Sequence, residues 1–239
     1  MAGASVEERW VLRIGGWAAV VGSLLGGVGN LVHPVTPMHD PVGVARAIAD
    51  SHQWVPVHLA IVLGIVLMLG GLVALYHTIR GGVAGALARL GLFAAVAGVT
   101  IGLVLVILDG VAAYQLAQEW AAAAPGDQAV ALGLVHLNET LNFALASLFN
   151  LVFAGVTFIL FGLAVVLSDV YPRGLGWIVL VAGVASFGAG LVQAFTGEPT
   201  EASRGLTIFG PTVITLWLLV VGILLVRMAR NGSRLPVGR

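Results

Sequence analysis

Asp109 is the residue whose place in the sequence most directly suggests chemistry. It interrupts an otherwise apolar run, residues 100–113. A carboxylate in a membrane span costs about 2.5–3.5 kcal/mol on insertion scales, so it usually faces a partner or a wet cavity. A carboxyl group held there suits a general acid or a proton relay. We expect Asp109 to be catalytic; the alternative is a structural hydrogen bond to a neighbouring helix.

His136 and Glu139 form a second candidate pair. They are three residues apart, so they lie on one face of a helix. This spacing suits proton transfer or a shared metal ion. The alternative is that Glu139 only interacts with the dipole of a helix start. We expect Glu139 and His136 to act together with Asp109 as the catalytic group.

His33 and His58 are candidate metal ligands. His33 follows the first apolar run and His58 lies near the start of the second, so both imidazoles should lie at a similar depth. Together with His136 they offer three nitrogen ligands to a divalent metal ion. Two histidines can also hold a haem iron, which we consider the weaker alternative. Histidines that only lie at the membrane interface are the structural alternative, so the cofactor stays unidentified.

Several other chemistries are excluded by composition. The chain has no cysteine and no lysine, which rules out thiolate sites, disulfides and Schiff-base chemistry. The eleven arginines are balanced by eleven acidic residues, so no net basic field attracts nucleic acid. The zincin motif H-E-x-x-H, the hydrolase motif G-x-S-x-G and a Gly-rich phosphate loop are all absent from the sequence.

The elements that must position these residues are membrane helices. Of 239 residues, 59% are hydrophobic and only 9% are charged, against about 25% charged in soluble domains. Six apolar runs are long enough to cross about 30 Å of hydrocarbon. They cover residues 11–32, 55–76, 87–114, 137–167, 175–195 and 207–226. We therefore predict one integral-membrane domain, 1–239, with an all-α bundle of six transmembrane helices.

The loop after the first run is rich in proline. Three prolines between residues 34 and 41 end the first helix. Asp40 and Pro41 then make a good N-cap and first position for a short helix over 42–51. We expect this helix to lie in the membrane interface.

The arginines predict the orientation of the chain. Nine of them flank one side of the predicted spans, and only Arg46 and Arg204 fall on the other. By the positive-inside rule both termini are cytoplasmic. The arginine-only usage with abundant Gly, Ala and Val is typical of a high-GC bacterial genome, which places the protein in a bacterial plasma membrane. The outer face then carries five of the six histidines, namely His33, His39, His52, His58 and His136.

Small and polar residues mark the contacting faces of the helices. Gly15, Gly22, Gly26 and Gly29 fall within about 60° of one another on the first helix, which favours close helix packing or an oligomer. An arginine followed four residues later by an aromatic residue opens the first, third and fifth spans. This weak repeat suggests three stacked hairpins; ordinary interfacial anchoring is the alternative.

The same helices should enclose a pocket open to the outside. The residues that we expect to contact its ligand are Trp54, His58, Phe143, Phe149 and Gln193. Apolar and aromatic walls suit a lipophilic molecule such as an isoprenoid, a quinone or a lipid. Acid–base cyclisation, isomerisation or hydrolysis would then be the reaction. A non-catalytic subunit, sensor or assembly factor, or a protein that handles metal ions or protons, remains the alternative.

The second half of the chain carries a recognisable pattern. It includes NLVFAG at 150–155, Phe161 and Gly162, Ser168, and YPRGLGW at 171–177. Here the chain resembles a group of uncharacterised six-span bacterial membrane proteins, classed as a family of unknown function. The resemblance covers all six spans and implies a fold but no activity, so it assigns no site residue. The histidine-rich first loop does not match the group's pattern.

The natural absence of cysteine makes the topology directly testable. Single cysteines placed at Ser51 and Ser203 should react with a membrane-impermeant maleimide in intact cells, because both positions are predicted to be extracytoplasmic. A cysteine at Ser233 should react only after the cells are lysed. The reverse labelling pattern would contradict the predicted orientation.

Overall fold

The computed structural model of the chain contains helices joined by short loops, and no strand among the residues that it describes. These are residues 6–37, 40–197 and 200–231, without the side chains of 201–204. His39, one of the predicted outer histidines, and the labelling position Ser233 lie outside the described residues.

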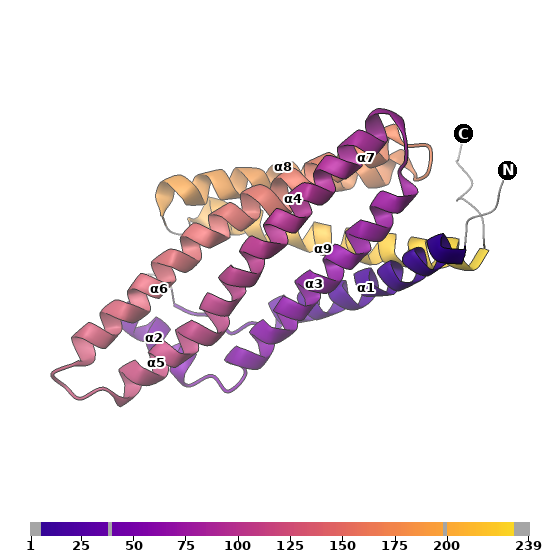
Figure 1. Ribbon diagram of the computed structural model, residues 1–239. Coiled ribbons are helices and arrows are strands. Elements are labelled where there is room, and N and C mark those ends of the chain that lie inside the picture. Colours follow the sequence, from indigo (N-terminus) through magenta and orange to yellow (C-terminus); the bar gives the residue numbers. More distant parts are fainter. Residues whose placement is uncertain (1–5, 38–39, 198–199, 232–239) are drawn as a thin grey trace.

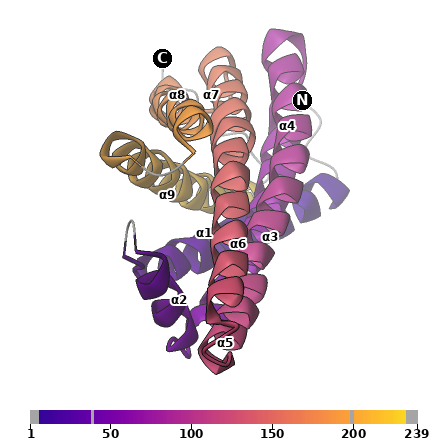
Figure 2. The same ribbon diagram turned by 90° about the vertical axis from the view of Figure 1, so that its left-hand side faces the viewer.

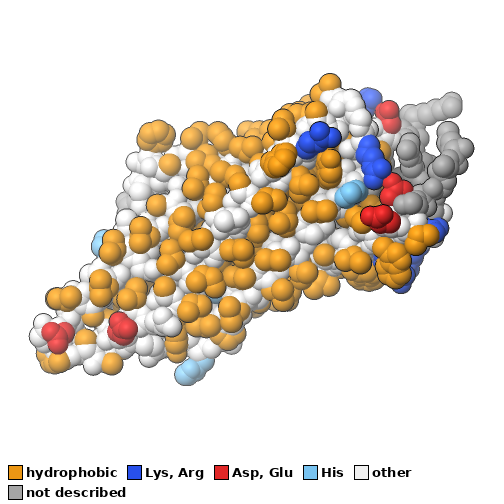
Figure 3. Space-filling model, viewed as in Figure 1, with side chains coloured by type: hydrophobic (Ala, Val, Ile, Leu, Met, Phe, Trp, Pro, Cys, Tyr) orange, Lys and Arg blue, Asp and Glu red, His pale blue; other side chains and the backbone are white. Residues whose placement is uncertain are grey.

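Six helices are long and apolar enough to cross a membrane, which confirms the predicted fold class. In chain order the elements are α1 (Val6–Leu31), α2 (Pro41–Ala49), α3 (Trp54–Thr78), α4 (Gly82–Ile107), η1 (Leu108–Ala112), α5 (Ala113–Ala122), α6 (Gln128–Phe149), η2 (Asn150–Thr157), α7 (Phe158–Leu167), α8 (Arg173–Thr196) and α9 (Glu201–Asn231). The face seen in Figure 3 is covered by apolar side chains along most of its length. The chain is therefore a multi-pass membrane protein.

The third and fourth spans are longer than one crossing requires. They run over 41 and 40 residues and are continuous through the π-helical turns η1 and η2. Such helices rise about 60 Å, twice the hydrocarbon thickness. Their distal parts, α5 and the start of α6, form an arm that extends beyond the other helices (Figure 1).

The membrane helices pack around the bundle in sequence order. α1 packs on α3, α3 on α4, α4 on α7, α7 on α8 and α8 on α9, and α9 returns to α1. The three predicted hairpins therefore exist as packed neighbours, and the contact between α9 and α1 closes them into a ring (Figures 1 and 2). α1 begins and α9 ends at the same end of the bundle (Figure 1).

Glycines let the helix backbones approach closely. Gly22 on α1 is buried against Gly64 on α3, where an added Cβ would lie 2.7 Å from the Gly64 carbonyl oxygen. Gly98 on α4 is packed equally tightly against Phe153 of η2. The glycine face predicted for the first helix thus packs within the chain, as expected for small residues at membrane helix contacts.

The short helix α2 begins as its sequence predicts. The Asp40 side chain accepts a hydrogen bond from the backbone N–H of Gly43 at 2.9 Å, and Pro41 occupies the first turn. Val44 and Ile48 of α2 join Trp54, Ala113 and Ala117 in a small buried cluster. α2 therefore holds the start of α3 against α5 beside the functional residues described below.

Gly98→Ala tests the close contact between α4 and η2. Its Cβ would lie 2.6 Å from the Cβ of Phe153, and overpacking of this kind costs about 1–3 kcal/mol. The thermal unfolding midpoint in detergent should fall. Gly188→Ala is the matched control, because no atom lies within 4 Å of its added Cβ. Equal midpoints for the two variants would contradict the packing.

Candidate functional site

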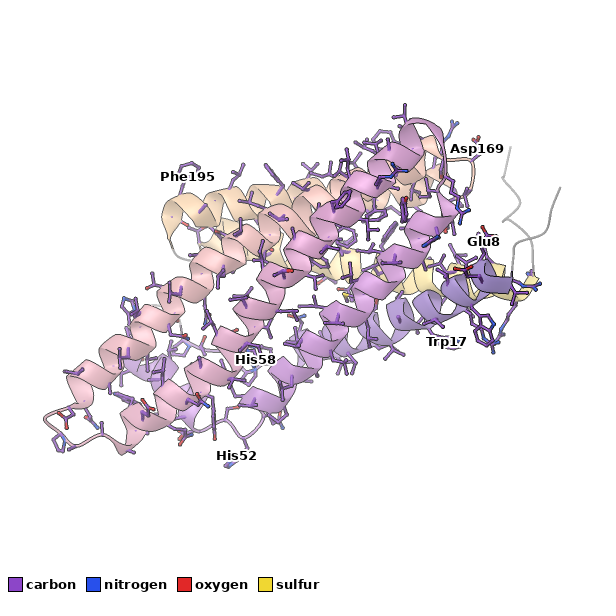
Figure 4. The ribbon with its side chains drawn as sticks, in the orientation of Figure 1. Glu8, Trp17, His52, His58, Asp169 and Phe195 are labelled. Atoms are coloured by element: carbon purple, nitrogen blue, oxygen red, sulfur yellow. The ribbon has the colours of Figure 1, made fainter. Side chains whose placement is uncertain are left out.

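Three side chains from three different elements meet at the end of the bundle near α2 and α5. They are His33 in the loop after α1, His58 on α3 and Asp109 in η1. The two Nε2 atoms are 3.0 Å apart, His58 Nε2 lies 3.1 Å from Asp109 Oδ2, and His33 Nε2 lies 3.9 Å from that oxygen. His58 is buried inside the bundle, whereas Trp17 and Phe195 project outward (Figure 4).

The backbone fixes the tautomer of both imidazoles. His58 Nδ1 lies 2.7 Å from the carbonyl oxygen of Trp54, one helical turn earlier. His33 Nδ1 lies 2.9 Å from the carbonyl oxygen of Pro34. A carbonyl only accepts, so each Nδ1 carries the hydrogen and each neutral ring presents the lone pair of Nε2. Both lone pairs point into the group.

Asp109 is held by side chains from two other helices. The Trp54 indole N–H donates to the backbone carbonyl of Asp109 at 2.7 Å. Asn142 Nδ2 donates to Asp109 Oδ1 at 3.3 Å, and Asn138 Nδ2 donates to the carbonyl of Leu108 at 3.3 Å. A π-helical turn leaves carbonyls free for such bonds and is often found at functional sites. Asp109 Oδ2 is therefore turned toward the two histidines.

Gly110 lets the π-helical turn reach His58. It is buried, and an added Cβ would collide with the Cβ of His58. The Trp54 ring packs on both imidazoles, with ring centroids 5.2 Å from His33 and 4.9 Å from His58. Backbone contact on one side and the indole on the other thus restrict the rotation of both imidazole rings.

The three atoms lie close enough to one another that they could hold a metal ion together. Two neutral Nε2 atoms and an ionised carboxylate oxygen are all acceptors, so the arrangement needs either a proton on one Nε2 or a metal ion between the three atoms. The point equidistant from atoms with these separations is about 2.0 Å from each, which is the usual Zn–N distance. Each imidazole also donates its other N–H to a carbonyl, as metal-bound histidines usually do.

The ionisation of His33 favours the same role. Burial and the neighbouring His58 lower its pKa, and the carboxylate of Asp109 opposes that shift only partly. The ring is therefore neutral at pH 7, which is the form that binds a metal ion.

The three residues form part of the wall of a cavity of about 450 Å³, within the range of roughly 300–1,000 Å³ typical of small-molecule sites. Helices α1, α2, α3, α4, α6 and α9 all contribute to it. Its polar residues include Asn142 and Glu139, and its apolar walls include Phe143 and Phe149. The cavity thus combines a small polar region with long apolar walls.

The structure brings some of the predicted site residues together and separates others. Asp109 and Glu139 line the same cavity, as do Trp54, His58, Phe143 and Phe149. His136 is exposed and lies outside both the cavity lining and the three-residue group. Gln193 does not line the cavity, but its side chain bonds Asn150 and Thr207, which do.

Sequence reasoning did not identify Asn138 and Asn142 as part of the site. Both are buried, and both hold η1 in place. One signal was available: they are one helical turn apart on the same predicted span as Glu139. The indole of Trp54 was expected to contact a ligand, and the structure adds its bond to the backbone of Asp109.

Comparison with known proteins gives one match. The family model described as "Domain of unknown function (DUF4386)" matches residues 14–222. No curated protein and no solved structure matches the chain. The match extends from the first membrane helix to the last and includes His33, His58 and Asp109. The chain therefore belongs to the DUF4386 family, in agreement with the resemblance noted from its sequence.

Proposed function

We propose that this membrane protein binds a divalent transition-metal ion through His33, His58 and Asp109, at the polar end of a cavity for a lipophilic molecule. The observation that carries the proposal is the convergence of two Nε2 lone pairs and one carboxylate oxygen. Two histidines and one carboxylate are the ligand set of several catalytic zinc sites and of non-haem iron sites.

Three protein ligands leave coordination positions open for a fourth ligand. Sites of this kind are typical of metal ions that act on a substrate rather than only stabilise a fold. The same three residues border the cavity, so a molecule bound there would reach the open positions. A bound ion would act as a Lewis acid there, and Glu139 is available in the wall as an acid or base.

This proposal changes the ligand set that the sequence suggested. His33 and His58 keep their proposed role, and Asp109 takes the third position because its Oδ2 faces both imidazoles. His136 is left out of the proposed ligand set, because it is exposed and does not line the cavity. A bacterial plasma membrane and an outward-facing cavity remain part of the proposal, because they rest on the arginine distribution of the sequence.

Metal content tests the ligand set. Purified protein should bind one divalent ion per chain, measured by elemental analysis and by Co²⁺ titration. His58→Gln and Asp109→Asn should each weaken binding by about 100-fold or more, and Trp54→Phe, which removes only a supporting bond, by about tenfold. His52→Gln is the control, because His52 is exposed and points away from the bundle (Figure 4).

The same titration separates the two ligand sets. His136→Gln should leave the affinity unchanged if Asp109 is the third ligand. Loss of the ion in His136→Gln with retention in Asp109→Asn would contradict the proposal. If neither the wild-type protein nor any variant binds an ion, the metal site is refuted. His33, His58 and Asp109 would then be a hydrogen-bonded group that shares protons.

The affinity should also depend on pH. Protons compete with the metal ion for Nε2, and the pKa of His33 lies below its ordinary value because the ring is buried beside His58. The site should therefore stay loaded at neutral pH and lose its ion below about pH 6. Equilibrium dialysis between about pH 8 and pH 5 measures this. Constant occupancy across that range would show that the histidines are not the ligands.

A further inference from the structure

A second pocket lies between the start of α1 and the end of α9, at the opposite end of the bundle from the candidate metal ligands. Its volume is about 340 Å³, within the range of roughly 300–1,000 Å³ typical of small-molecule sites. Arg9, Trp10 and Arg13 of α1 line it, together with Arg230 of α9. No acidic side chain is among the described residues that line this basic pocket. Three positive charges from two helices therefore surround one small space.

The packing of α1 on α9 positions the basic pocket. Gly16 on α1 lies against α9, where an added Cβ would be 2.9 Å from the carbonyl oxygen of Gly222 and 2.8 Å from a methyl group of Val226. Arg13 comes three residues before Gly16, and Ala229 comes three residues after Val226. Both line the pocket. The close backbone contact therefore fixes the two helices one turn away from the arginines, which border the same space.

The arginines of the basic pocket form no ion pair within the described part of the chain. Glu7 and Glu8 belong to the same two turns of α1 but do not line the pocket. Glu8 instead pairs with Arg80, with 2.9 Å between Oε1 and Nη1. The guanidinium carbon of Arg13 lies 5.5 Å from the centre of the Trp10 ring, which holds this side chain at the pocket. The positive charge of the pocket is therefore not neutralised by a neighbouring carboxylate.

The basic pocket borders the side of α1 that faces lipid. Trp10, Ile14 and Trp17 follow one another at helical spacing, and all three are exposed. Trp17 projects outward from the bundle (Figure 4). Exposed apolar side chains on a membrane helix contact acyl chains, and tryptophan is enriched where the membrane meets water. Because Trp10 belongs both to the pocket and to this apolar stripe, one molecule can contact the arginines and the stripe together.

A phosphate group suits the arginines, because a guanidinium donates two parallel hydrogen bonds to phosphate oxygens. Basic pockets between membrane helices on the cytoplasmic side are known to hold the head groups of anionic lipids, and the arginine distribution predicts that this end is cytoplasmic. We propose that the basic pocket binds an anionic phospholipid. Its phosphate lies between Arg9, Arg13 and Arg230, and its acyl chains follow the exposed stripe of α1.

The same geometry disfavours a zwitterionic lipid. The choline or ethanolamine cation of such a lipid would lie among three arginines, and no carboxylate among the described lining residues could offset the repulsion. A head group with a net negative charge avoids that cost. The proposed lipid site is independent of the proposed metal site, because the two share no residue.

A titration of the delipidated full chain in detergent, followed by native mass spectrometry, tests the head group. Dioleoyl phosphatidylglycerol and dioleoyl phosphatidylcholine have the same acyl chains and differ in net charge. Phosphatidylglycerol should bind at least about tenfold more tightly, because about one arginine contact or more distinguishes the two head groups. Equal affinities for the two lipids would overturn the proposal.

Glycerol phosphate distinguishes a lipid from a phosphate compound in solution. It carries the phosphate group but no acyl chain, so a millimolar excess should leave the bound phosphatidylglycerol in place. Complete displacement under these conditions would show that the pocket takes a soluble phosphate and would overturn the assignment of a lipid.

Two variants localise the site, one on each helix. Arg13→Gln and Arg230→Gln should each weaken binding of phosphatidylglycerol about fivefold and leave phosphatidylcholine unchanged. Arg89→Gln is the matched control: it removes the same charge near the same end of the bundle, but Arg89 is exposed on α4 and does not line the pocket. The thermal unfolding midpoint without lipid verifies that each variant is folded. An equal loss in all three variants would indicate general charge attraction and would refute the site.

Discussion

His33, His58 and Asp109 bring three electron-pair donors within 4.8 Å of one another, and side chains from the neighbouring helices hold them there. Two neutral imidazoles and a carboxylate within hydrogen-bond range of each other repel unless a positive charge lies between them. His58 is buried, whereas the side chains of His33 and Asp109 are 30% and 37% exposed, so water screens this repulsion only in part. In the proposed metal site, an ion at about 2.0 Å from each atom would turn this repulsion into coordination.

The surrounding fold can be understood as support for that arrangement. The backbone carbonyls of Trp54 and Pro34 set the tautomers, and the indole of Trp54 holds η1 from the side of α3. The fourth span reaches past the membrane crossing as α6 and brings Asn138 and Asn142 to the same turn. Glycine contacts between α1 and α3, and between α4 and η2, bring these helices close together.

Much of this architecture could be predicted from the sequence. Membrane spans follow from length and hydropathy alone, and the N-cap Asp40 follows from local chemistry. The proximity of His33 and His58 was also predictable, because consecutive antiparallel helices bring the end of one next to the start of the other. Their contact at 3.0 Å agrees with that expectation.

The remainder depends on features that helical periodicity does not encode. Positions along α6 face the cavity at 135, 138, 139, 142, 143 and 146. His136 lies at the edge of this face, beside the direction of Phe143, and its side chain is exposed. The π-helical turns also change which side of the helix the later residues lie on. Each such turn contains an extra residue, so all later side chains point in a different direction from the one that α-helical periodicity predicts. Sequence periodicity therefore placed Asp109 in a polar interior but did not show which atoms it would meet.

X-ray absorption at the metal edge of the loaded wild-type protein in nanodiscs would identify the ligands of the ion. Two imidazole nitrogens and at least one oxygen are expected at about 2.0–2.2 Å, with the imidazole signal halved in His58→Gln. A spectrum with oxygen ligands alone, or one that is unchanged in His58→Gln, would contradict this ligand set.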